Sequence, residues 1–268
     1  MTVYDTLSAA LRDDRPVALA TVVEGTAVGR KLLVDESGEV TGGLGDPDLD
    51  RKVTRDAGGA LSTGWTGTRR YEACFGDDKA DTETVLVFVE SFVAPPRMLI
   101  FGAVDFSASL VRVAKVLGYR VTVCDARAVF ATVERFPEAD EVVVDWPQRL
   151  LDRVGPTLTA RDALCVLTHD ARFDVPALLG AVATDVGYIG AMGSRRTHGD
   201  RVRRLKEAGI DDEGLARIHS PIGLDVGAST PEETAIAICA EIVAVRTGRD
   251  ARPLTTTQGP IHAPRTGP

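Results

Sequence analysis

The sequence predicts an α/β protein: a small α+β N-terminal domain over residues 1–94, then a Rossmann-like domain with a mostly parallel sheet over residues 97–250. Three observations support this prediction. Residues before 94 follow a strand-and-turn rhythm, Ala94-Pro95-Pro96 suits neither a helix nor a central strand, and apolar strands alternate with amphipathic helices afterwards. The Thr-, Pro- and Gly-rich tail, 251–268, has too little apolar content to fold alone and is expected to be flexible.

The composition limits the classes of partner. The 268 residues carry a net charge of -8, which argues against a nucleic-acid-binding surface because phosphate recognition needs a concentrated basic footprint. The charged N-terminus does not resemble a signal peptide, and no apolar run reaches membrane-spanning length, so no membrane insertion and a cytoplasmic location are expected. The four cysteines form no CxxC pair, so the sequence indicates neither a disulfide framework nor a metal site.

The first domain is expected to begin with a helix, because Leu7, Ala10 and Leu11 share one helical face. A second helix is expected over Asp48 to Leu61, ending at the glycine-weakened stretch Gly58-Gly59. The strand predictions, which rest on apolar and β-branched runs between turn residues, are PVALATVV (16–23), RKLLVD (30–35), GEVTGGLG (38–45), TRRYEACFG (68–76) and TVLVFVESF (84–92).

The second domain is expected to alternate strands with helices, which predicts a parallel sheet covered on both faces. The predicted strands lie in MLIFG (98–102), YRVTVCD (119–125), EVVVDW (141–146), ALCVLTHD (163–170) and VGYIGAMG (186–193). The predicted helices cover residues 105–117, 175–184, 198–208 and 231–245. Thr230 and Pro231 suit the N-cap and first position of the last helix.

The turn after the first strand of this domain occupies the place of a dinucleotide fingerprint, and its candidate binding residues are Gly102, Ala103, Asp105, Phe106 and Ser107. Only the first glycine of the fingerprint is kept. A branched Val104 stands where a glycine would let the backbone approach a pyrophosphate, and Asp105 would repel a phosphate. We therefore expect NAD(P) binding in the usual pose to be disfavoured.

Two further groups of candidates follow strands. Asp125 stands where a ribose-binding acid normally lies, although capping of the strand through a loop amide explains it equally well. Arg127 is expected to line the same crevice. His169 and Asp170 end a strand at its carboxyl edge, where a histidine can carry a proton or anchor a ligand, and a structural turn is the alternative.

The stretch from Gly187 to Thr197 predicts an anion site. Gly190 and Gly193 allow close backbone approach, and the following helix starts with Ser194, Arg195 and Arg196, which can bind a phosphate by backbone amides and bidentate contacts. The alternative is that the glycines are only turn residues. The more distal cations are interpreted as a solvated helix face: Arg201, Arg203, Arg204 and Lys206. The apolar loop from Pro221 to Ala228 could close over a ligand, and tight packing is its alternative.

The chain resembles the XdhC/CoxI family. The resemblance runs from about residue 97 to 248, and its most specific strings are GSRR (193–196) and PIGLD-GA-TPEE (221–233). It also includes GYRVTVCDAR, RFPEADEVVVDWP and LTHD, and PVALATVV, KLLVD and VLVFVESF resemble the family's smaller N-terminal domain. Family members bind the molybdenum cofactor, protect it during sulfuration and deliver it to apoenzymes of the xanthine dehydrogenase or CO dehydrogenase type. The resemblance therefore implies a molybdenum-pterin cofactor and a molybdenum hydroxylase apoenzyme as partner.

The chain departs from the family pattern at three turns. Residues 41–47 (TGGLGDP) lack the cysteine of the family's glycine-rich turn, and residues 77–84 (DDKADTET) replace its Cys-Gly-Gly turn. The family's GxGHVG turn reads GAVDFS here, with Asp105 in place of the histidine. A thiol-dependent step at the two cysteine positions is therefore excluded.

Three functions remain open on the sequence. The first is a non-catalytic chaperone that binds a pterin-phosphate or nucleotide-type ligand at the strand ends. The second is an NAD(P)-dependent oxidoreductase, supported by the strand-helix pattern and Asp125 but opposed by Val104. The third is a scaffold for a partner hydroxylase with an empty crevice. No catalytic residue is assigned, and a homodimer is compatible with the sequence.

Overall fold

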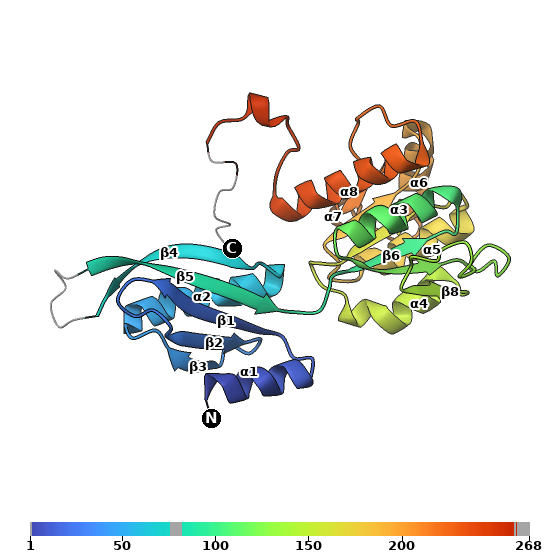
Figure 1. Ribbon diagram of the computed structural model, residues 1–268. Coiled ribbons are helices and arrows are strands. Elements are labelled where there is room, and N and C mark those ends of the chain that lie inside the picture. Colours follow the sequence, from blue (N-terminus) through green and yellow to red (C-terminus); the bar gives the residue numbers. More distant parts are fainter. Residues whose placement is uncertain (1, 76–81, 260, 262–268) are drawn as a thin grey trace. The chain divides into compact units, whose positions relative to one another are not determined.

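The computed structural model describes residues 2–75, 82–259 and 261 (Figure 1). The described chain divides into two compact units, one built mainly on residues 1–94 and the other on residues 95–257. Residues 76–81 and most of the end of the chain, 260 and 262–268, lie outside the described residues. Each unit has its own sheet and its own buried core.

The first unit is an antiparallel sheet with the strand order β3-β2-β1-β5-β4. Its elements in chain order are α1 (Val3–Arg12), β1 (Val17–Glu24), β2 (Lys31–Asp35), β3 (Val40–Gly43), α2 (Pro47–Thr63), β4 (Gly67–Cys74) and β5 (Thr82–Phe92). Helix α2 covers one face, where Leu49 and Val53 pack against Val85 and Val87. Helix α1 covers part of the other face through Ala10.

Helix α2 includes the whole predicted helix, Asp48 to Leu61, and extends it to Pro47–Thr63. It passes through Gly58 and Gly59 without a break, and Gly64 caps its end in a left-handed conformation with φ 66°. Each glycine inside a helix costs about 1 kcal/mol relative to alanine. Burial of Ala60 and Leu61 against the sheet offsets that cost, so tertiary packing decides where the helix ends.

The second unit confirms the predicted Rossmann-like class, because every strand pair in its six-stranded sheet is parallel. The strand order is β11-β10-β9-β6-β7-β8. The strands are β6 (Arg97–Phe101), β7 (Arg120–Cys124), β8 (Glu141–Val143), β9 (Ala163–Val166), β10 (Tyr188–Ala191) and β11 (Ile218–His219). The helices are α3 (Asp105–Val116), α4 (Pro147–Val154), α5 (Ala171–Val182), α6 (Arg195–Glu207), α7 (Asp212–Ala216) and α8 (Pro231–Thr247), with 3-10 turns at Gly155–Thr157 and Leu254–Thr256.

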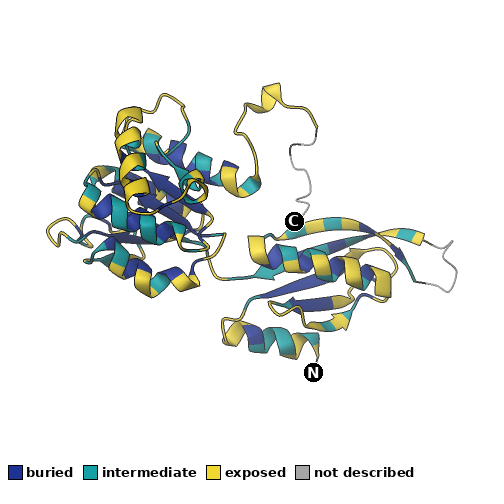
Figure 2. Cartoon of the chain, turned by 180° about the vertical axis from the view of Figure 1, so that it is seen from behind, coloured by how far each residue is buried: buried dark blue, intermediate teal, exposed yellow. Residues whose placement is uncertain are grey.

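Helices cover both faces of this sheet (Figure 1). Helices α3 and α8 pack on one face, where Leu110 and Ile238 meet Ile100. Helices α4 and α5 pack on the other, where Leu151 and Leu178 share a core with the strands. The strands are almost fully buried in Figure 2, which is the pattern expected for a parallel sheet between two helical layers.

Several boundaries differ from the sequence predictions. Helix α5 begins at Ala171 rather than Val175 because Asp170 caps it, and α6 begins at Arg195 because Ser194 caps it. Strand β8 is three residues long, and α4, α7 and β11 were not predicted because they are too short to show a period. Within the described residues, no helix is both long and apolar enough to cross a membrane.

Candidate functional site

The parallel sheet brings most of the predicted site residues to one edge. Strands β6, β7, β9 and β10 run in the same direction, so the turns that follow them gather at their carboxyl ends. The chain leaves β6 for β7 on one side and later returns to β9 on the other. Ligands of open α/β sheets bind at such a switch point.

The turn after β6 uses its own backbone groups for internal contacts. The Gly102 amide donates to the Cys124 carbonyl at 2.9 Å, and the Ala103 amide donates to Asp125 Oδ2 at 2.9 Å. The buried Ser107 hydroxyl donates to the Gly102 carbonyl. Two of the turn's amides are therefore already paired and are not free to bind a phosphate.

Asp105 and Phe106, the other candidate binding residues of this turn, make contacts away from the turn's backbone. The Asp105 side chain is 89% exposed and lies 3.3 Å from Arg135. Phe106 is partly buried and packs against the core beneath α3. Val104 has a non-helical backbone and occupies the N-cap of α3, so it places a branched side chain at the helix start. Val104 therefore stands at the point where the usual pyrophosphate contact requires a glycine.

Asp125 supports the turn from the neighbouring strand. It is 2% exposed, and its two oxygens accept hydrogen bonds from the Ala103 amide and from the backbone and guanidinium of Arg127, all within 2.9 Å. Burial raises the pKa of Asp125, but these hydrogen bonds outweigh it and hold the pKa below its ordinary value. The arrangement matches the capping alternative, because a ribose hydroxyl would have to compete with four internal donors.

The hydrogen bonds with Asp125 fix the orientation of the Arg127 guanidinium. Its guanidinium lies 4.5 Å from the ring centroid of Phe130 and 5.9 Å from that of Phe173. Phe173 in turn stacks on Trp146 at 4.7 Å. The Arg127 side chain keeps 47% of its surface exposed, so it remains accessible at the edge of the sheet.

His169 and Asp170 follow β9. Asp170 caps α5 by accepting from the Arg172 amide at 3.0 Å, and its carboxylate also pairs with the Arg172 guanidinium. Hydrogen bonds from Arg172 lower the pKa of Asp170 to about 2. In the described part of the chain, the exposed His169 has no hydrogen-bond partner and borders a cavity.

The predicted anion turn starts helix α6. Ser194 is its N-cap and accepts from the Thr197 amide at 3.2 Å. Arg195 and Arg196 occupy the first two helical positions and are exposed, with Arg195 3.7 Å from Asp225. A contact between two such exposed groups contributes little to stability, so Arg195 is not firmly held by Asp225.

Glycine is required at Gly190 and Gly193 by close packing. A Cβ on Gly190 would lie 2.4 Å from Ile222 Cδ1, and one on Gly193 would lie 2.6 Å from Thr197 Oγ1. Gly190 therefore lets the loop after β11 lie against β10. Gly193 lets the turn lie against the start of α6, beside the exposed arginines.

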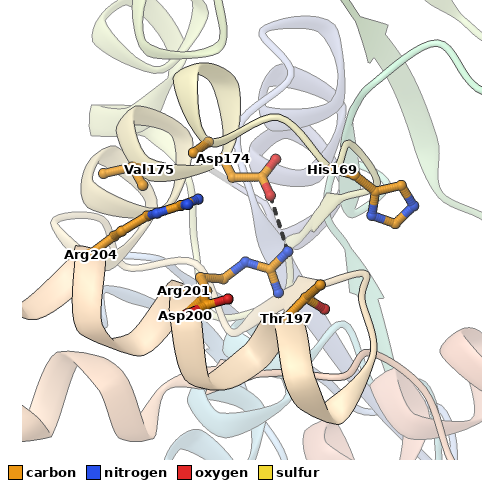
Figure 3. Close-up of a pocket in the computed structure, with 8 residues that line it drawn as sticks. His169, Asp174, Val175, Thr197, Asp200, Arg201 and Arg204 are labelled. Atoms are coloured by element: carbon orange, nitrogen blue, oxygen red, sulfur yellow. Dashed lines mark hydrogen bonds and ion pairs between the residues drawn. The ribbon is translucent and has the colours of Figure 1, made fainter.

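A cavity of about 230 Å³ opens between α5 and α6, next to this turn. It is lined by His169, Ala171, Asp174, Val175, Thr197, Asp200, Arg201 and Arg204. Figure 3 shows the Arg201 guanidinium at its centre, between Asp174 and Thr197, with His169 and Arg204 on opposite sides. Two acids, two arginines and a histidine make the cavity polar.

Arg201 corrects the prediction of a solvated helix face. Its side chain is 7% exposed and donates to Asp174 Oδ2 at 3.0 Å, to the Met192 carbonyl at 2.6 Å and to Ser220 Oγ at 2.8 Å. Burial raises the pKa of Asp174, although hydrogen bonds from Thr168 and Arg201 oppose that rise. Arg201 thereby ties α6 to α5, to the segment just before Gly193 and to the loop after β11.

Sequence reasoning also missed how that loop is anchored. Glu241 of α8 accepts from the Gly223 amide at 2.8 Å and from the Tyr188 hydroxyl. His219 lies 3.4 Å from Glu241 Oε1 and stacks on Tyr188 at 4.8 Å. These contacts fix the loop that carries Asp225 beside the start of α6.

The cysteines offer little reactivity in the second unit. Burial raises the pKa of Cys124 and of Cys239 to about 12, and it raises that of Cys165 well above its ordinary value. In the first unit, Gly42 and Gly43 end β3 without a neighbouring cysteine. Residues 77–81, which are most of the segment that replaces the family's Cys-Gly-Gly turn, lie outside the described residues. No cluster of three potential metal-ligating side chains occurs in the described ranges.

Comparison with known proteins places this geometry in context. A family model described as the XdhC Rossmann domain matches residues 98–242, and one described as the XdhC and CoxI family matches residues 10–72. The chain is 30% identical over 164 residues to a probable xanthine dehydrogenase subunit from Bacillus subtilis (strain 168), covering 61% of this chain and 47% of that protein. It is 34% identical over 84 residues to the "Molybdenum cofactor insertion chaperone PaoD" of Escherichia coli (strain K12), covering 31% of this chain and 26% of that protein.

The chain thus matches less than half the length of these two relatives. Among solved structures, a protein of Bacillus halodurans described as a xanthine dehydrogenase is similar with a TM-score of 0.53 and 21% identity. The alignment covers 94% of this chain and 97% of that one. At this identity the likeness shows a shared fold.

Proposed function

Because the chain belongs to the XdhC and CoxI family, we propose that it is an accessory protein in the maturation of a molybdenum hydroxylase of the xanthine dehydrogenase or CO dehydrogenase type. In this role it binds a molybdenum-pterin or nucleotide-type cofactor and passes it to the apoenzyme without a catalytic step of its own. Two relatives support the proposal through their names, one as a cofactor insertion chaperone and the other as part of a xanthine dehydrogenase.

The observation that carries the binding role is the turn from Gly193 to Arg196. It lies at the carboxyl end of β10, it begins a helix of 13 residues, and it presents two exposed arginines. The helix dipole and the guanidinium groups both favour a phosphate at this position. We assign Arg127, His169 and Asp170 to the surrounding wall, and Asp125 to the positioning of Arg127.

The residues present fit the organic part of such a cofactor. A phosphate needs cationic and backbone donors, and the start of α6 offers both. A planar ring needs an accessible flat surface, and Arg127 beside Phe130 offers one. When bound, the cofactor would supply the molybdenum chemistry of the client enzyme, and this chain's residues would only hold and orient it.

An NAD(P)-dependent activity is not favoured by the described geometry. The Ala103 amide donates a hydrogen bond to Asp125, and both oxygens of Asp125 accept hydrogen bonds within the protein, so neither group is free for the dinucleotide contacts that the fold usually makes.

In a thermal-shift panel, NAD and NADP are therefore expected to leave the melting temperature unchanged. A pterin nucleotide at about 100 times its Kd should stabilise the protein by about 2.7 kcal/mol. No shift with any pterin nucleotide would favour the scaffold hypothesis.

The double variant Arg195→Ala with Arg196→Ala tests the anion turn. Charge-assisted hydrogen bonds contribute about 1.5 to 3 kcal/mol each, so loss of both should weaken pterin-nucleotide binding at least about tenfold. The fold should survive because both arginines are exposed. Calorimetry of the two proteins at one salt concentration measures the difference.

A matched control removes two other cations from the same helix. Arg203→Ala with Lys206→Ala changes the net charge equally, but these side chains pair with Asp200 and Asp212 away from the turn. Their loss should alter binding less than about twofold, as expected for screened charges at a distance. Equal effects of the two double variants, or normal binding by Arg195→Ala with Arg196→Ala, would refute the assignment.

A further inference from the structure

We propose that the cavity between α5 and α6 is a second anion site, which takes one tetrahedral oxyanion of the phosphate class. Two sources share this chemistry, a phosphate monoester of the cofactor and free phosphate. The proposal rests on the proposed function only for the first source. It adds a site built from Arg201, Arg204 and His169 to the one at the start of α6.

The size of the cavity suits a small polar ligand. A water molecule takes about 30 Å³ of the liquid, so about 230 Å³ corresponds to roughly eight waters, which is enough for one tetrahedral oxyanion and part of its hydration. Whole drug-sized ligands occupy pockets of about 300 to 1,000 Å³. The cavity is therefore smaller than the pocket of a ligand such as a whole pterin nucleotide, and it can hold a single phosphate group.

The floor of the cavity retains unused hydrogen-bond donors. A guanidinium group has about five N–H donors. Within the described residues, Arg201 makes three hydrogen bonds, to Asp174, Met192 and Ser220, which leaves two N–H groups. Because the Arg201 side chain lines the cavity, these two N–H groups can donate to an acceptor that enters it.

The charges of the lining favour an anion over a cation. Asp174 is paired with Arg201, and Asp200, the other carboxylate of the lining, lies 3.5 Å from Arg203, which does not line the cavity. Among the described residues, Arg204 has no ion-pair partner, and Figure 3 shows its guanidinium directed toward the cavity. A cation would face two guanidinium groups, whereas an oxyanion gains the charge of Arg204 and the donors of Arg201.

Two exposed cations of α6, Arg204 and Lys206, provide the test. Arg204→Ala and Lys206→Ala remove the same charge from the same helix, but only Arg204 lines the cavity, and Lys206 pairs with Asp212 away from it. Inorganic phosphate is titrated into the full chain at constant pH and ionic strength, and the imidazole signals of His169 are followed by NMR. The chain has four histidines, so a His169→Gln variant assigns the signal.

The expected result is saturable movement of the His169 signals in the wild type and in Lys206→Ala, with affinity at least about tenfold weaker in Arg204→Ala. Arg195→Ala with Arg196→Ala should leave this movement intact, which separates the two anion sites. Equal weakening in Lys206→Ala and Arg204→Ala would overturn the proposal. So would movement of His169 that disappears only when Arg195 and Arg196 are replaced.

Competition identifies the source of the anion. If a pterin nucleotide displaces phosphate from the cavity, the cofactor's own phosphate occupies it. If phosphate remains while the pterin nucleotide binds at the start of α6, the cavity serves free phosphate. Failure of the proposed function would appear as no binding of any pterin nucleotide with the phosphate titration unchanged, so the two proposals fail separately.

Discussion

Replacement of Arg201 by methionine is expected to destabilise the second unit by about 3 to 5 kcal/mol. The substitution keeps much of the side-chain volume but leaves the buried Asp174 carboxylate without its cation. The carbonyl of Met192 and the hydroxyl of Ser220 lose a donor at the same time. Because a typical domain has only about 5 to 15 kcal/mol of stability, a loss of this size would be plain in a urea titration.

The pH dependence of this loss has a definite sign. Burial already raises the pKa of Asp174, and removal of Arg201 should raise it further. A carboxyl group with a raised folded-state pKa binds its proton more tightly when folded, so the variant regains stability as the pH falls below that value. The deficit of Arg201→Met should therefore be largest near pH ~7 and shrink toward pH ~4.

Fluorescence can follow the second unit alone. Trp146 stacks on Phe173 within it, and Trp65 belongs to the first unit, so a Trp65→Phe background isolates the signal. Arg203→Met is the control, since it removes an exposed arginine from the same helix and should cost less than about 0.5 kcal/mol. Similar midpoints for Arg201→Met and Arg203→Met would show that the buried ion pair is not structural.

A second large effect is expected for Gly102→Ala, which should cost about 2 to 4 kcal/mol. Gly102 has φ 111°, a conformation that alanine adopts only with strain. The new Cβ would also lie 2.6 Å from Thr168 Cγ2 and 3.1 Å from the Thr168 amide nitrogen. The close approach of the turns after β6 and β9 therefore depends on this glycine.

Gly118→Ala separates the two causes of that loss. Gly118 also has a positive φ, 80°, but a Cβ there would meet nothing within 4 Å. It should therefore show only the backbone cost, about 1 kcal/mol. Urea midpoints of the two variants measure the difference, and equal midpoints would mean that contact with Thr168 adds nothing.

Much of the fold was predictable because parallel strands and their helices carry strong local signals. The turn residues after β6 and the Thr230 cap of α8 were placed correctly from residue chemistry alone. The start of α5 was not, because Pro176 resembles a helix start while the real cap, Asp170, lies six residues earlier. Short elements such as β11 depend on pairing with a neighbouring strand, which no local pattern reveals.

The site was less predictable, for a related reason. Arg201, Arg203 and Arg204 are the same residue type within four positions of one helix, yet only Arg201 is buried. Its burial depends on Asp174, which comes from another helix 27 residues earlier. The spacing of Thr197, Arg201 and Arg204 on one helical face was the available signal, and it identifies the cavity wall only once α5 is known to lie opposite.

The short outer strands of the parallel sheet limit backbone pairing with any partner protein, and this would include the client enzyme of the proposed function. Strand β8 at one margin has three residues and β11 at the other has two. A visiting peptide that extended this sheet by backbone pairing would gain only a few ladder hydrogen bonds at either margin. In the proposed role, recognition through this unit would rely on side chains of its loops and helices, and point substitutions on that surface would then be able to change the choice of client.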